Sequence, residues 1–139
     1  MISSWFHLNP RSGVPLYLQL KEQVKTAVAG GVLKPGDRLL PVREMADNLS
    51  VNPNTVARAY SELEREGLLS SEQGRGTFIR AAEPLLGEEE RKIQVQGLMD
   101  KVLVEAFNLR LTPEELQLLW KQRLQAWETR LRGAKRGGW

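Results

Sequence analysis

The residues best suited to chemistry lie between positions 52 and 58, where short polar side chains lead up to an arginine. An asparagine amide can donate to and accept from an adenine edge at once, and an arginine fork pairs with guanine in the same way. This set predicts base reading in the major groove of double-stranded DNA, although a solvent-facing helix with a polar cap would carry the same residue types. The candidate base-reading residues are Asn52, Asn54, Thr55 and Arg58.

Two further basic features accompany this segment. Arg43 lies near the start of the preceding helical pattern, where it could reach a phosphate or a base, or pair with Asp47 on its own helix. Gly74, Arg75 and Gly76 resemble a finger that approaches DNA closely, because glycine admits close backbone approach and arginine supplies positive charge. Glycines are also common in hairpin turns, so the order of the three features carries the interpretation.

Three predicted elements would position these groups. A short helix begins at Pro41, and a second begins at Asn52 as N-cap, with Pro53 at its first position, and ends at Gly67. Residues 68–79 form two β-rich stretches around the glycines, which predicts a hairpin. Two short helices followed by a hairpin are the pattern of a winged helix-turn-helix, with the hairpin as its wing.

The N-terminal part adds two predicted elements to this unit. Residues 5–10 (WFHLNP) alternate apolar and polar side chains before a proline, which predicts a short edge strand. Pro15 then opens an amphipathic helix that Gly30 and Gly31 end. Its apolar positions recur every four residues, at Leu16, Leu20, Val24 and Val28.

After residue 80 the pattern is helical only. One helix is predicted from Pro84 to about Leu109, and a second begins at a capping box formed by Thr112 and Glu115. Their apolar side chains exceed what one antiparallel pair can bury, which predicts a homodimer, although the helices could instead fold back on the winged-helix core. The predicted dimerisation residues are Val102, Phe107, Leu119, Trp120, Leu124 and Trp127.

The composition argues against several other functions. The chain has no cysteine and a single histidine, His7, and it lacks a glycine-rich phosphate loop and a nucleophile–base pair. We therefore expect no enzyme activity, catalytic residue, metal site or cofactor. No apolar run is long enough to cross a bilayer and no secretion signal is present, so we expect a cytoplasmic protein without a membrane partner. The net charge of +3 is compatible with DNA binding without requiring it.

Two stretches, PLYLQLKEQVKTAVAGGVLKPGDRL and VREMADNLSVNPNTVARAYSELEREGLLSSEQGRGTFI, resemble the DNA-binding domain of the GntR family of bacterial regulators over about residues 6–80. The short C-terminal region resembles the YtrA subfamily, many of whose members repress their own operon and neighbouring transporter genes. The resemblance implies DNA contacts by Arg43, Asn52, Asn54, Thr55, Arg58 and Gly74, with Arg75 in the wing. One departure is Pro41, which replaces the family's usual helix-capping serine and puts a phosphate contact there in doubt.

Together these observations predict a mainly α protein with two regions. Residues 1–80 form a winged helix-turn-helix DNA-binding domain, and residues 81–139 form a two-helix dimerisation region with a basic tail. We expect a homodimeric regulator, a repressor on an inverted-repeat operator. The alternative is a winged-helix adaptor that binds proteins and not DNA; polar Asn54, Thr55 and Arg58 argue against it. No feature identifies a small-molecule effector.

Overall fold

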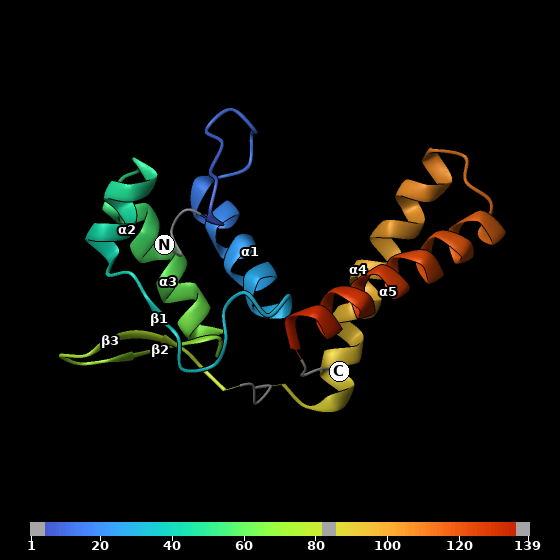
Figure 1. Cartoon of the computed structure of the whole chain (residues 1–139). Coiled ribbons are helices and arrows are strands. Elements are labelled where there is room, and N and C mark those ends of the chain that lie inside the picture. Colours follow the sequence, from blue (N-terminus) through green and yellow to red (C-terminus); the bar gives the residue numbers. More distant parts are fainter. Residues whose placement is uncertain (1–4, 82–85, 136–139) are drawn as a thin grey trace. The chain divides into compact units, whose positions relative to one another are not determined.

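The chain divides into two compact units, one within residues 1–83 and the other within residues 84–139 (Figure 1). The computed structural model describes residues 5–81 and 86–135, with side chains as far as residue 130. Each unit is described by itself below.

The first unit combines three helices with a small sheet. The helices are α1 (Leu16–Ala29), α2 (Val42–Leu49) and α3 (Pro53–Arg65), and the strands are β1 (Arg38–Leu39), β2 (Leu69–Glu72) and β3 (Gly76–Ile79). The strand order is β1-β3-β2 and both pairings are antiparallel. Figure 1 shows α3 between α1 and α2, with the β2–β3 hairpin extending away from the helices. This arrangement confirms the predicted winged helix-turn-helix.

A single apolar core holds these elements together. Every element of the first unit contributes to it, and the buried stripe of α3 lies at positions 56, 59, 60 and 63 as the helical spacing predicts. The Tyr60 hydroxyl donates to the Leu40 carbonyl at 2.7 Å, so this buried polar group is satisfied. The core residues are Phe6, Leu20, Val24, Ala27, Leu33, Leu39, Met45, Ala46, Val56, Ala59, Tyr60, Leu63, Leu69 and Ile79.

The two helices of the helix-turn-helix have different starts. Pro41 is the N-cap of α2 and makes no side-chain capping bond, which is the consequence of the missing serine. Asn52 caps α3 as predicted, with Pro53 at its first position. Between them, Ser50 takes a left-handed conformation with φ of 57°, and the Val51 N–H returns to the Ala46 carbonyl at 3.0 Å. The chain thereby turns between the end of α2 at Leu49 and the start of α3 at Pro53.

The predicted edge strand at residues 5–10 is wrong, because no strand among the described residues pairs with it. Two glutamine side chains of α1 satisfy its backbone instead. The Gln23 amide accepts from the His7 N–H at 2.9 Å and donates to the His7 carbonyl at 2.7 Å, and Gln19 pairs with Asn9 in the same way at 2.8 and 2.9 Å. The third strand of the sheet is β1, in a segment for which the sequence analysis predicts no element.

The second unit is a pair of helices, α4 (Glu88–Asn108) and α5 (Pro113–Lys135). The predicted capping box is present: the Thr112 N–H donates to Glu115 Oε1 at 2.8 Å, and the Glu115 N–H donates to Thr112 Oγ1 at 3.1 Å. The first helix begins at Glu88, four residues later than expected, and the predicted start at Pro84 lies outside the described residues. Within the described ranges no helix is long and apolar enough to span a membrane.

Candidate nucleic-acid interface

The N-terminal end of α3 carries the first candidate DNA contacts. Asn52 Oδ1 accepts from the Asn54 N–H at 2.8 Å, and the Thr55 N–H donates to the Asn52 carbonyl at 2.9 Å. The Asn52 side chain is therefore engaged as a cap, which leaves its amide NH₂ as the group for an outside partner. Asn54 is exposed and Thr55 is half-buried. Asn54 thus presents an exposed side chain that the cap does not use.

Arg58 lies one turn further along α3 and has two partners within the protein. Its guanidinium carbon lies 3.8 Å from the centroid of the Tyr17 ring, which belongs to α1. Its Nε donates to Glu62 Oε2 at 3.3 Å. The side chain is nevertheless 60% exposed, so it remains accessible from outside.

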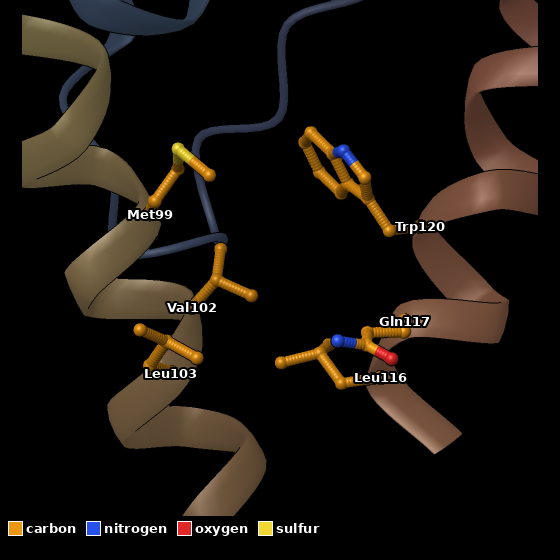
Figure 2. A pocket seen from close by; sticks show the side chains of 6 residues that line it. All are labelled: Met99, Val102, Leu103, Leu116, Gln117 and Trp120. Atoms are coloured by element: carbon orange, nitrogen blue, oxygen red, sulfur yellow. The ribbon is translucent and has the colours of Figure 1, made fainter. Parts of the chain in front are cut away.

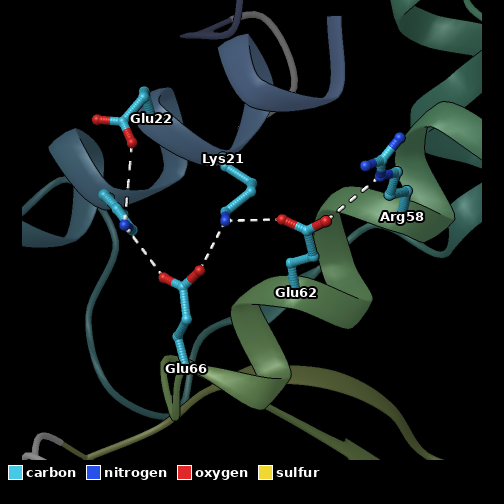
Figure 3. Close-up of polar contacts among 6 residues, drawn as sticks. Lys21, Glu22, Arg58, Glu62 and Glu66 are labelled. Carbon is cyan, nitrogen blue, oxygen red and sulfur yellow. Dashed lines mark hydrogen bonds and ion pairs between the residues drawn. The ribbon is translucent and has the colours of Figure 1, made fainter. Parts of the chain in front are cut away.

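A network of ion pairs ties this part of α3 to α1 (Figure 3). Lys21 Nζ lies 2.9 Å from Glu62 Oε1 and 2.6 Å from Glu66 Oε2, and the Lys21 side chain is only 9% exposed. Glu66 also pairs with Lys25 at 3.1 Å. A buried ammonium is tolerated only when it is paired and hydrogen-bonded, and both conditions hold here.

The pKa values of this network follow from its hydrogen bonds. The bond to Glu66 raises the pKa of Lys21 above its ordinary value, and this outweighs the opposite effect of burial. The bond from Lys21 lowers the pKa of Glu62. Burial alone would raise the pKa of Glu66, but the bonds from Lys21 and Lys25 lower it overall. All three groups are thus held in their charged forms.

Arg43 is the candidate contact from α2. It is the second residue of that helix and its side chain is exposed. Among the ion pairs of the described residues, none joins it to Asp47, so the alternative role offered by their spacing is not realised here. Arg43 is available to a phosphate or a base.

The wing presents Arg75 between two glycines that need their conformational freedom. Gly74 and Gly76 have φ of 78° and 123°, in the region that side chains rarely adopt. Arg75 Nη1 donates to Glu72 Oε1 at 2.7 Å, and its guanidinium carbon lies 5.6 Å from the Phe78 ring centroid. The side chain remains 73% exposed at the tip of the hairpin.

Arg38 is a basic residue beside the wing that the sequence analysis missed. A Cβ added to Gly76 would lie 2.6 Å from Arg38 Nε, so the arginine crosses directly over this glycine. Arg38 pairs with Phe78 across the β1–β3 register. The sequence around Arg38 (KPGDRL) does not indicate that this residue lies beside the wing, because the β1–β3 pairing brings it there. Position 76 therefore favours glycine both because of its backbone conformation and because Arg38 leaves little room for a side chain.

All eight predicted DNA-contacting residues lie on exposed or half-buried positions of the first unit, on α2, α3 and the wing. Asn52 bonds to two of the others: its side chain caps the Asn54 N–H, and its backbone carbonyl accepts from the Thr55 N–H. The arginines at 58 and 75 are each held by a neighbouring carboxylate and ring instead. Tyr17 and Glu62, which hold the Arg58 side chain, were not identified by the sequence analysis.

The second candidate surface lies on the helix pair. Between α4 and α5 is an open apolar pocket of about 240 Å³ (Figure 2), and Val102 and Trp120 are the two predicted dimerisation residues that line it. Phe107, Leu119 and Leu124 lie outside the pocket and are exposed, Phe107 to 81%. Among the described side chains of this unit, only Ala106 is buried. The remaining lining residues are Met99, Leu103, Leu116 and Gln117.

Comparison with known proteins identifies the family. Residues 16–79 match the family described as bacterial regulatory proteins, gntR family. The chain is 38% identical over 99 residues to the HTH-type transcriptional repressor YtrA of Bacillus subtilis, across 71% of this chain and 76% of that relative.

Solved structures extend the similarity over both units. A transcriptional antiterminator from Listeria monocytogenes EGD-e superposes with a TM-score of 0.75 and 32% identity, across 88% of this chain and 91% of that one. YtrA from Sulfolobus acidocaldarius, a GntR-family transcription factor, superposes with a TM-score of 0.60 and 29% identity, across 72% of this chain and 98% of that one. The relatives are named as regulators, which confirms a regulator and not an enzyme. The chain therefore belongs to the GntR family of bacterial regulatory proteins and is similar to its YtrA-type members.

Proposed function

We propose that this regulator binds double-stranded DNA sequence-specifically and acts as a homodimeric repressor, with α3 as its recognition helix. The observation that carries the proposal is the polar end of α3, which is capped by Asn52 and displays Asn54 and Arg58 outward beside a glycine-tipped wing. Short and forked polar groups in the first turns of such a helix are the side chains that read base edges.

The three arginines among the candidate contacts, all of them exposed, divide into two roles. Arg58 belongs to the recognition helix, where an arginine fork can pair with guanine. Arg43 and Arg75 lie on the flanking α2 and wing, which suits contacts to the phosphate backbone. Such contacts fix the orientation of the protein on the duplex and supply affinity that depends on salt.

The apolar surface of α4 and α5 supports dimerisation by this helix pair. Among the described residues, the buried core of the first unit is formed by side chains between Phe6 and Ile79. Large apolar side chains on both helices remain exposed, and the pocket between the helices is open. Monomers seldom leave so large an apolar surface in water, and a second copy of the same helix pair supplies a self-complementary cover.

A two-fold dimer fixes the form of the operator. Two recognition helices related by a two-fold axis bind two half-sites that form an inverted repeat. When one DNA-binding unit of the dimer is bound, the other is held near the second half-site at a high effective concentration. By its similarity to YtrA, the first DNA to examine is the region upstream of the chain's own operon and of neighbouring transporter genes.

Selection from a pool of duplexes with a randomised centre tests this function. Sequencing of the fraction bound by the full chain should reveal an enriched inverted repeat. Asn54→Ala should lose most of that enrichment, whereas Arg91→Ala, a charge change on exposed α4, should retain it. A chain that binds no duplex at low salt would instead be the protein-binding adaptor, and enrichment of single half-sites alone would contradict the dimer.

A further inference from the structure

The Arg58 side chain is held by two contacts, and these leave one edge of the guanidinium open. The Tyr17 ring covers one face of the guanidinium at 3.8 Å, and Nε donates to Glu62. Among the described residues, no hydrogen bond or ion pair engages Nη1 or Nη2. This open edge is the one that forms bidentate bonds to guanine or phosphate.

The support under Arg58 becomes steadily more buried toward the core. Glu62 uses Oε2 for Arg58 and Oε1 for Lys21, so one carboxylate joins the surface arginine to a buried lysine (Figure 3). The side chains of Arg58, Glu62 and Lys21 are 60%, 21% and 9% exposed. A guanidinium attached to such an anchor has fewer rotamers to lose when it binds DNA.

We propose that Tyr17, on α1, is a positioning residue for DNA reading: its ring stacks on Arg58 and, with Glu62, holds the Nη1–Nη2 edge toward the duplex. The inference rests on the proposed function of α3. Tyr17 is half-buried and packs against the core, so a leucine there keeps the apolar contact but loses the aromatic platform together with the hydroxyl. A phenylalanine keeps the platform and removes the hydroxyl.

A double-mutant cycle on DNA binding tests the role. The probes are the duplex selected by the unmodified chain and a mixed-sequence duplex without that site. Tyr17→Leu should weaken binding to the selected duplex about two- to fivefold, the range of an exposed cation–π contact, with less effect on the mixed one. Tyr17→Phe should bind like the unmodified chain. In the Arg58→Ala background, Tyr17→Leu should cause no further loss.

Each contrary outcome has its own meaning. Equal losses for Tyr17→Phe and Tyr17→Leu would show that the hydroxyl contacts DNA and would overturn the proposal. So would full binding by Tyr17→Leu, or a loss that persists in the Arg58→Ala background. If the unmodified chain selects no sequence, the proposed function itself fails and this inference with it. Thermal unfolding of every variant shows that the differences come from binding and not from loss of fold.

Discussion

Replacing Leu124 with aspartate should separate the proposed homodimer into monomers. Leu124 lies on α5 and is 44% exposed in the single chain. Full burial of a leucine stabilises by about 2 kcal/mol, so covering the exposed part contributes about 0.9 kcal/mol in each copy and about 1.8 kcal/mol in the pair. Its loss corresponds to about a twentyfold weaker dimer, and desolvation of two carboxylates weakens it further.

Sedimentation equilibrium of the full chain over a range of concentrations measures this change directly. Gln125→Asp is the matched control, because it adds the same charge one residue further along α5, away from the face that carries Leu124 and Trp127. The control should sediment like the unmodified chain. A Leu124→Asp chain that keeps its helical content and its dimerisation constant would refute the assignment of the interface to this surface.

The other predictions concern the first unit. Asn54→Ala should cost about 1–3 kcal/mol on the selected duplex and little on mixed DNA, and equal losses in anisotropy titrations would make it a phosphate contact. Arg75→Ala should lower the slope of log K against log salt by about 1, and an unchanged slope would remove the wing from the interface. Gly76→Ala should destabilise by about 1–3 kcal/mol in urea unfolding, because φ is 123° and an arginine side chain lies against the new Cβ. The native pKa values of Glu62 and Glu66, which both bond to Lys21, are lowered, so their contribution to stability is present above the ordinary value of 4.5 and is lost as pH falls through the lowered values. Lys21→Met should therefore reduce the loss of unfolding free energy at acid pH, measured by urea unfolding. An unchanged dependence of that free energy on pH would contradict the network.

The sequence predicted the elements whose signals are local. The cap and proline at the start of α3 and the capping box of α5 are short patterns in which the interacting residues lie within four positions. The helical spacing of apolar residues likewise defined α1 and the buried stripe of α3. Such features depend on neighbours along the chain, so a single sequence contains all the information needed to place them.

The features that escaped prediction depend on distant partners. The alternation in residues 5–10 is compatible with a strand, but the segment pairs with the side chains of Gln19 and Gln23. β1 has two residues, too few for any pattern, and exists because β3 lies beside it. The Tyr17–Arg58 contact spans 41 positions and two helices, and neither residue type signals it alone.

The buried ion pairs of Lys21 also fix the axial position of α3, the proposed recognition helix, against α1. Apolar contacts between two helices are non-directional and tolerate sliding along the axis, whereas an ammonium bonded to Glu62 and Glu66 is satisfied in one axial register only. A slip of α3 by one residue, about 1.5 Å, would break both bonds. The axial position of Asn52 and Asn54 is therefore set by ion pairs near the other end of α3.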